Sequence, residues 1–199
     1  MSRFIESIKL CDGNFVRLPF HQERVNGVFQ DFFKNKKPFD LKEALENENF
    51  PKTGIFKCRI IFDSNIQLIE FSPYTRREIK SLKLIETSID PMRYKSEDRQ
   101  KINEAFAQKG DCDDIIMLNN GLLSDASYSN IALWDGKNWY TPALPLIYGT
   151  NRAALLQAGK LIERQIRKED LANYTRLRLF NAMIEFGEIE LDCNAILTD

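Results

Sequence analysis

Three dipeptides that favour tight hairpin turns constrain the fold more than any other feature of this sequence. They are Asp12-Gly13, Asn120-Gly121 and Asp135-Gly136, and each lies between short apolar segments. Such pairs readily adopt the positive φ angles of two-residue hairpin loops, so the flanking segments are expected to pair as antiparallel strands. The sequence therefore predicts a protein built largely on β-hairpins.

The first 90 residues are expected to form a small N-terminal lobe, a mostly antiparallel sheet with one or two helices. Residues 4–10 alternate apolar and polar side chains, as a half-buried strand does. Residues 21–33 carry an apolar stripe at helical spacing, and Asp40 is placed to cap a short helix that follows. Further strands are expected over residues 15–18, 54–62, 66–71 and 79–86.

Residues 91–199 are expected to form a larger, β-rich C-terminal lobe, which makes the fold class α+β. No linker rich in Gly, Pro or Ser separates the lobes, so they are expected to pack directly around a ligand cleft. Gly110 would end the first helix of this lobe. Helices are expected over residues 97–109, 151–160 and 168–172, and strands over residues 114–118, 129–134, 139–140, 162–166, 178–182 and 188–196.

Composition excludes several functional classes. The net charge is −1, which gives no electrostatic basis for binding nucleic acid or an anionic membrane. No run of about 18 apolar residues occurs, and the start of the chain has no apolar signal core. The four cysteines form no paired spacing and the chain has one histidine, so no metal site is expected. These features predict a cytoplasmic protein with reduced thiols.

A series of polar motifs follows between residues 95 and 182, and their order resembles the class IV aminotransferase family. That family includes branched-chain and D-amino acid aminotransferases and aminodeoxychorismate lyase. The resemblance is looser near the N-terminus, where residues 4–8 and His21-x-x-Arg24 match. The motifs are Lys95-x-x-Asp98-Arg99, Asp113-Asp114-Ile115-Ile116, Gly121-Leu122-Leu123-Ser124-Asp125 continuing to Ser129-Asn130-Ile131, Thr141-Pro142, Gly149-Thr150-Asn151-Arg152 and Phe180-Asn181-Ala182.

The resemblance implies a two-lobed fold that binds pyridoxal 5′-phosphate and forms a homodimer. Lys95 matches the lysine that bonds covalently to the cofactor aldehyde and later moves a proton as a general base. Asp125 matches a glutamate that bonds the ring nitrogen, with an arm shorter by one methylene. Arg24 matches the arginine that binds the phosphate. Without the motif, each has an ordinary reading: a solvated Lys95, a turn aspartate and a solvated helix arginine.

Thr150 and Asn151 match the family's phosphate-binding dipeptide, and a simple helix N-cap is the alternative reading. Asn181 matches the strand end on the phosphate side, where Ala182 replaces a frequent threonine. His21 is expected to support the loop near Arg24 rather than to act as acid or base. Weaker candidates for binding a substrate carboxylate, which could equally be solvated residues, are Arg59, Tyr74, Arg76 and Arg77.

The Phe180-Asn181-Ala182 motif is closest to the lyase branch, so the resemblance implies a 4-amino-4-deoxychorismate lyase of folate biosynthesis, which makes 4-aminobenzoate and pyruvate. Amino acid transamination is the alternative, because both reactions begin with the same exchange of amines. A cofactor-binding protein with little catalysis and a structural protein that has kept only the fold are further alternatives. The N-terminal lobe is short for the family, so part of the substrate pocket is expected either to be missing or to be supplied by a partner chain.

Overall fold

The computed structural model describes residues 3–198, which form two compact units. The first contains the chain up to Thr75 together with the short segment Tyr94–Asp98, and the second contains Arg76–Arg93 and the chain from Arg99 onward. The division expected after residue 90 lies within the segment 76–93 of the second unit. The chain then returns to the first unit for residues 94–98 before it continues in the second. Met1 and Ser2, part of the expected signal-free start, lie outside the described residues.

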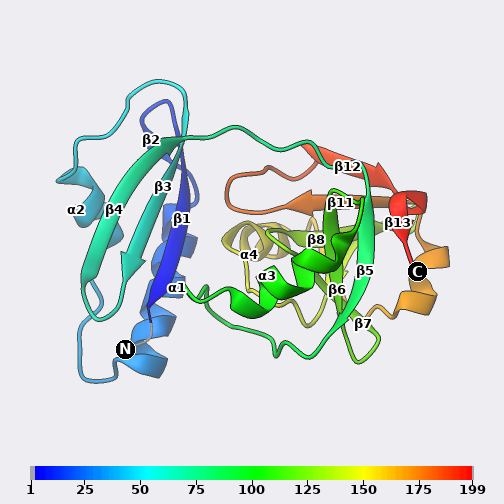
Figure 1. Cartoon of the computed structure of the whole chain (residues 1–199). Helices are drawn as coiled ribbons and strands as arrows, with labels where there is room; N and C mark the ends of the chain where they lie inside the picture. The colour runs from blue at the N-terminus through cyan, green and yellow to red at the C-terminus, as the bar shows by residue number, and fades with distance from the viewer. Residues whose placement is uncertain (1–2, 199) are drawn as a thin grey trace. The chain divides into compact units, whose positions relative to one another are not determined.

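A four-stranded antiparallel sheet forms the first unit, in the order β2-β1-β3-β4 (Figure 1). Asp12 and Gly13 both have positive φ, which confirms the first predicted hairpin turn. The apolar stripe of the first helix, with Val25 and Phe29, packs on the sheet face that carries Phe4 and Ile8. The elements are β1 (Phe4–Cys11), β2 (Asn14–Phe15), α1 (Leu18–Phe32), α2 (Leu41–Glu46), β3 (Ile55–Phe62) and β4 (Ile66–Pro73).

Two boundaries in this unit differ from the sequence prediction. The strand expected over residues 15–18 is only β2, because α1 already begins at Leu18. Proline in the first turn of a helix loses no intrahelical hydrogen bond, so Pro19 is compatible with this earlier start. The Asp40 cap is confirmed, since its side chain accepts from the backbone N–H groups of Lys42 and Glu43.

The second unit contains two sheets, each covered by a helix. In one, with the order β13-β5-β6-β7, α3 packs on β5 and β6 through Ile102 and Ala105. In the other, with the order β10-β9-β8-β11-β12, α4 packs through Leu155 near Ala132 and Phe180. The strands are β5 (Leu82–Thr87), β6 (Asp114–Asn119), β7 (Leu122–Ala126), β8 (Asn130–Trp134), β9 (Trp139–Pro142), β10 (Ile162–Arg164), β11 (Arg176–Phe180), β12 (Ile189–Asp192) and β13 (Ile196–Leu197).

The helical segments of the second unit are short. The helix expected from residue 97 begins only at Gln100, and residues 94–98 belong to the first unit. Among residues 3–198, no helix is both long enough and apolar enough to cross a membrane. The α-helices are α3 (Gln100–Phe106) and α4 (Thr150–Gln157), and the 3₁₀ turns are η1 (Ala107–Lys109), η2 (Lys168–Asn173) and η3 (Cys193–Ala195).

Strand pairing corrects the prediction in three places. The strand expected in the first lobe over residues 79–86 is β5, which pairs in parallel with β6 of the second unit. The sequence analysis gave no bounds for the strand that follows the predicted hairpin turn at Asn120-Gly121, which is β7 and pairs with β6. The final strand is divided into β12 and β13, which join different sheets. The differences at β5 and at β12 and β13 concern the choice of partner strand, which local sequence does not specify.

Candidate active site

Lys95 contacts the first strand of the protein, β1, through its backbone and through its amine. Residues beside it run antiparallel to the start of β1: Ser96 is bridged to Phe4, and the Ile5 N–H donates to the Lys95 carbonyl at 2.8 Å. This backbone pairing places the Lys95 amine, Nζ, at 2.9 Å from the hydroxyl of Ser7. Lys95 is half-buried, so it is not the fully solvated lysine of the ordinary reading.

Arg24 is held by a buried carboxylate, Glu6, which also comes from β1. Its Nε and Nη2 atoms donate to the two oxygens of Glu6, each at 2.7 Å. The Nδ1 atom of His21 lies 2.5 Å from the same carboxylate. Only 9% of the Arg24 side chain and 2% of the Glu6 side chain are exposed, so this is a buried cluster and not a solvated helix face.

Burial and neighbouring groups together set the pKa values of Glu6 and His21 in this cluster. Burial by itself would raise the pKa of Glu6, but the charge of Arg24 and the hydrogen bond from His21 outweigh it and hold that pKa at about 2. Burial lowers the pKa of His21 although Glu6 opposes the shift. His21 is therefore neutral near pH 7, and because a carboxylate only accepts, its Nδ1 carries the proton. This neutral donor orients the partner of Arg24.

The sequence analysis did not identify Glu6, although the pattern contained a signal. Glu6 lies between Phe4 and Ile8 on the apolar face of an alternating strand, where a carboxylate needs a buried partner. His21 and Arg24 are three residues apart, so they share one face of α1. Because Glu6 and Ser7 are successive strand residues, they point to opposite faces of β1. Arg24, which bonds Glu6, and Lys95, which bonds Ser7, therefore contact opposite faces of β1.

Asp125 is a buried carboxylate on β7, with 3% of its surface exposed. Its Oδ2 accepts from the Ile147 N–H at 2.9 Å, and its Oδ1 accepts from the Asn130 amide at 2.9 Å. These bonds reach across to other segments, so Asp125 is not the turn aspartate of the ordinary reading. Burial raises the pKa of Asp125 to about 7, against the lowering effect of these donors and of Arg152.

The other predicted residues of the second unit form a network at the start of α4. Thr150 and Asn151 are the first two helical residues, and Gly149 precedes them as the cap without a side-chain bond. The Asn151 amide donates to the carbonyls of Asn181 and Ile184, at 2.9 and 3.1 Å. Asn181 in turn donates to the Tyr128 carbonyl at 3.0 Å. Both asparagine side chains therefore bond backbone carbonyls of neighbouring segments. The first N–H groups of any α-helix, α4 included, point out of its N-terminus and make no bond within the helix.

The structure thus brings the predicted residues together in two groups. Asp125, Thr150, Asn151 and Asn181 are connected within the second unit, through Asn130 and the turn at residues 128–129. Arg24 and Lys95 belong to the first unit, where β1 connects them. Asn130 was part of the quoted motif, but the sequence analysis gave it no role.

Two of the weaker candidates already pair with acidic residues. Arg59 contacts Glu70 at 3.1 Å and Glu97 at 3.9 Å. Arg76 lies 3.9 Å from the Glu188 carboxylate and also donates to the Glu188 backbone carbonyl at 2.8 Å. Of the others, Arg77 lies 5.2 Å from the centre of the Tyr128 ring, and the Tyr74 backbone N–H donates to the Ile55 carbonyl at 3.1 Å.

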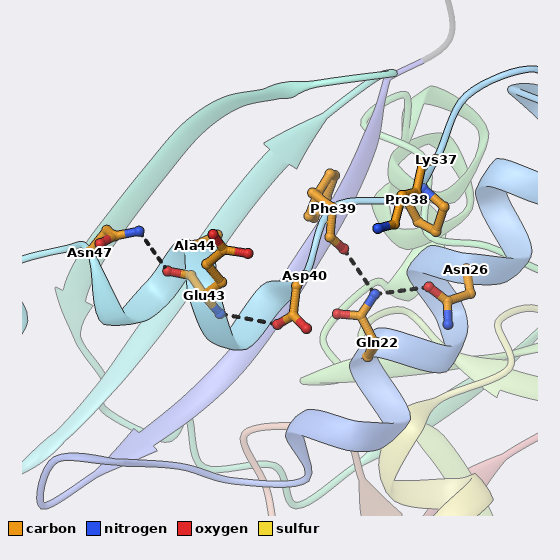
Figure 2. A pocket seen from close by; sticks show the side chains of 9 residues that line it. All are labelled: Gln22, Asn26, Lys37, Pro38, Phe39, Asp40, Glu43, Ala44 and Asn47. Carbon is orange, nitrogen blue, oxygen red and sulfur yellow. Dashed lines mark hydrogen bonds between the residues drawn. The ribbon is translucent and has the colours of Figure 1, made fainter.

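A polar pocket in the first unit lies between α1 and the segment that leads into α2 (Figure 2). Gln22 lines this pocket, and its side-chain amide donates to Asn26 at 2.9 Å and to the Phe39 carbonyl at 3.0 Å. The residues that line this pocket include none of the predicted site residues. It is therefore separate from the chemistry that the motifs predict.

Comparison with known proteins decides the family. The family model described as amino-transferase class IV matches residues 68–190, which is more than half of the chain. This protein belongs to the class IV aminotransferases. It is an enzyme of that family, whose members include aminotransferases and lyases dependent on pyridoxal 5′-phosphate. The predicted α+β fold of the family is likewise confirmed.

Individual relatives resemble this class IV enzyme over nearly its whole length. An uncharacterised protein of Haemophilus influenzae strain Rd is 31% identical over 185 residues, covering 92% of this chain and 98% of the relative. A crystal structure from Haemophilus somnus 129PT, provisionally named a 4-amino-4-deoxychorismate lyase, is 29% identical with a TM-score of 0.86. It covers 93% of this chain and 98% of that one.

A more distant structure shows the same fold with the cofactor present. It is a hypothetical aminotransferase from Mycobacterium tuberculosis in its pyridoxal phosphate-bound form. It is 15% identical with a TM-score of 0.72, and the match covers 92% of this chain and 78% of that one. At this identity the likeness concerns the fold alone.

The residues of this enzyme fit pyridoxal 5′-phosphate. A buried carboxyl group with a pKa of about 7, Asp125, is suited to accept a hydrogen bond from a protonated ring nitrogen. The start of α4 offers backbone donors to a phosphate. Lys95 supplies an amine beside a hydroxyl.

Proposed function

We propose that this class IV enzyme binds pyridoxal 5′-phosphate and converts 4-amino-4-deoxychorismate into 4-aminobenzoate and pyruvate. The buried carboxyl of Asp125 carries the proposal for the cofactor, because burial disfavours its ionised form and a protonated ring nitrogen beside it would favour that form. When bound, the cofactor supplies an aldehyde that takes the substrate amine and a ring that accepts electrons from the neighbouring carbon.

Each residue of the chain has a separate task in this proposal. Lys95 holds the cofactor through its amine and, once released, moves the proton at the carbon that bears the substrate amine. Ser7 accepts a hydrogen bond from that amine and restricts its orientation. Asp125 binds the ring nitrogen, while Arg24 and the start of α4, with Thr150 and Asn151, bind the phosphate. Asn181 holds the loop beside Asp125.

Lyase action is favoured over transamination by two observations. The Phe180-Asn181-Ala182 motif resembles the lyase branch, and the Haemophilus somnus structure provisionally named a lyase matches nearly the full length of both chains. The assigned residues would also serve transamination, since both reactions begin with the same exchange of amines and then move the same proton. The substrate assay must therefore include both outcomes.

The first experiment tests the cofactor and its attachment. The purified protein, incubated with pyridoxal 5′-phosphate and freed of excess, is expected to be yellow and to lose its colour on borohydride reduction. Mass spectrometry should then find the reduced cofactor on Lys95. Lys95→Ala should abolish the label, whereas Lys83→Ala on β5 should retain it. A label that persists in Lys95→Ala would refute the assignment of Lys95.

The second experiment tests the reaction. The loaded enzyme is given 4-amino-4-deoxychorismate, and pyruvate and 4-aminobenzoate are measured over time. Equal and steady release of both products is expected. Keto acid formation from a panel of amino acids, without pyruvate from the chorismate derivative, would identify an aminotransferase instead. Binding of the cofactor with neither activity would reject both reactions.

The proposal includes a homodimer, as the family resemblance implies. Light scattering coupled to size-exclusion chromatography should give a mass of twice 23.2 kDa. If the protein is fully active and has the mass of a single chain at micromolar concentration, the dimer is rejected.

A further inference from the structure

Asn130, the first residue of β8, has a role that neither the family motif nor the comparisons assign. Its side chain is buried, with 5% of the residue exposed. The amide nitrogen donates to Asp125 Oδ1 and to the Ile147 carbonyl, each at 2.9 Å. Ile147 also donates its own N–H to Asp125 Oδ2 at 2.9 Å. Asp125, Asn130 and Ile147 therefore form a closed ring of three hydrogen bonds.

This ring continues into the turn that opens α4. The side-chain oxygen of Asn130 lies against Gly149, where an added Cβ atom would collide with it. Gly149 has φ −68° and ψ 142°, a backbone conformation that any residue can adopt. The need for glycine at this position therefore comes from the approach of Asn130 and not from a special backbone conformation. Two residues after Ile147, Gly149 is the N-cap of α4, whose first helical residue is Thr150.

We propose that Asn130 is a positioning residue that joins Asp125 to the turn at Gly149, so that the ring-nitrogen end and the phosphate end of the cofactor site are built as one rigid part. The two ends of a bound cofactor are a fixed distance apart, so a carboxylate and a helix start that moved independently would bind it less well. This inference rests on the proposed use of the cofactor.

Asn130 differs from an asparagine that only satisfies the backbone. A backbone role would be met by its bond to the Ile147 carbonyl alone. The second bond, to Asp125, favours the ionised form of that carboxyl and fixes which of its oxygens faces the amide. The contact with Gly149 then ties this orientation to the helix. Asn119, on β6, offers a matched control, because its amide likewise donates to a backbone carbonyl, that of Ile89, at 3.1 Å.

The first test follows Asp125 in the cofactor-free full-length protein. The Asp125 side-chain carbon, labelled with ¹³C, is titrated by NMR in wild type, Asn130→Ala and Asn119→Ala. Loss of a donor to the ionised carboxyl should raise the pKa of Asp125 by about one unit in Asn130→Ala. Asn119→Ala should leave it unchanged. An unshifted Asp125 in Asn130→Ala would overturn the proposal, because a merely structural asparagine predicts that result.

The second test is a double-mutant cycle between Asn130 and Gly149. Gly149→Ala alone should lower the melting temperature by about 5 °C, since overpacking a closed contact is destabilising. In the Asn130→Ala background the colliding oxygen is absent, so the same Gly149→Ala change should cost little. Equal costs in the two backgrounds would show that the residues are not coupled and would overturn the proposal.

A third measurement separates this inference from the proposed function. The dissociation constant of pyridoxal 5′-phosphate should rise about tenfold in Asn130→Ala and stay unchanged in Asn119→Ala. Wild type that binds no cofactor would defeat the proposed function, while the titration and the cycle would still decide whether Asn130 positions Asp125. Wild-type binding with equal affinity in Asn130→Ala would overturn the inference and leave the function standing.

Discussion

The amine of Lys95 donates a 2.9 Å hydrogen bond to the hydroxyl of Ser7 on β1. The bond exists because the backbone beside Lys95 pairs with the start of the same strand, where the Ile5 N–H donates to the Lys95 carbonyl. Strand residues two apart point to the same face, so Ser7 follows Ile5 on the side that Lys95 occupies. Backbone pairing thereby fixes the Cα atom of Lys95, and the bond to Ser7 holds the amine at the end of its side chain.

Ser7→Ala is expected to lower the turnover of the loaded enzyme about tenfold, because the Lys95 amine loses an acceptor that restricts its orientation. Ser7→Thr keeps the hydroxyl and should retain most of the activity. Steady-state product formation checks both variants, and the cofactor content of each is measured in parallel. Equal turnover in wild type and Ser7→Ala would show that the contact has no part in the reaction.

Arg24→Lys is expected to weaken binding of pyridoxal 5′-phosphate about tenfold but to change binding of pyridoxal little. Lysine keeps the charge, yet it cannot reproduce the planar two-point contact by which Glu6 orients Arg24. Dissociation constants for both compounds check this expectation. Arg59→Lys is the control, since Arg59 pairs with Glu70 and Glu97. A parallel loss of affinity for both compounds in Arg24→Lys would exclude Arg24 as a phosphate ligand.

The Glu6 cluster is expected to make the protein sensitive to acid. The folded pKa of Glu6, about 2, lies below its ordinary value of 4.5, so its stabilisation is complete above pH 4.5 and is lost as the pH falls toward 2. The shift corresponds to about 3 kcal/mol. Urea unfolding between pH 7 and pH 2 should show a smaller acid-induced decrease in Glu6→Gln than in wild type.

Glu70→Gln is the control for that experiment, because the Glu70 side chain is 46% exposed and its ion pair with Arg59 is screened by water. Its acid-induced decrease should equal that of wild type. If Glu6→Gln and wild type lost stability in parallel as the pH fell, the Glu6 carboxylate would not be the group that the cluster stabilises.

Asp125 is expected to have the opposite effect in the cofactor-free protein. Its folded pKa, about 7, lies above the ordinary value of 3.8, so its contribution favours folding most below pH 3.8 and is lost as the pH rises through 7. The full difference is about 4 kcal/mol. Melting temperatures between pH 5 and pH 8 should therefore fall more steeply in wild type than in Asp125→Asn.

Bound cofactor should reduce that fall in wild type, because a protonated ring nitrogen compensates the buried carboxylate. The comparison uses melting temperatures of the same preparation with and without pyridoxal 5′-phosphate at each pH. Identical pH slopes in wild-type and Asp125→Asn cofactor-free proteins would mean that Asp125 is ionised in the folded state throughout this range.

The local signals in the sequence were strong wherever neighbours along the chain decide the structure. Asp12-Gly13 predicted a turn that the structure contains, and Asp40 predicted the cap of α2, because both depend on the conformation of a few adjacent residues. The apolar stripe with Val25 and Phe29 predicted the buried face of α1. Motif resemblance likewise identified the family, since the motifs are short continuous segments.

The tertiary structure decided which distant segments meet. β5 pairs with β6 and not with the first sheet, and the segment containing Lys95 joins β1, because strand partners are selected by packing across the whole unit. The same holds for Asn130, whose partners Asp125 and Ile147 come from different segments. The sequence by itself determined the chemical groups and the family, whereas only the folded chain determined their contacts, because hydrogen bonds and burial depend on distance in space and not on spacing along the chain.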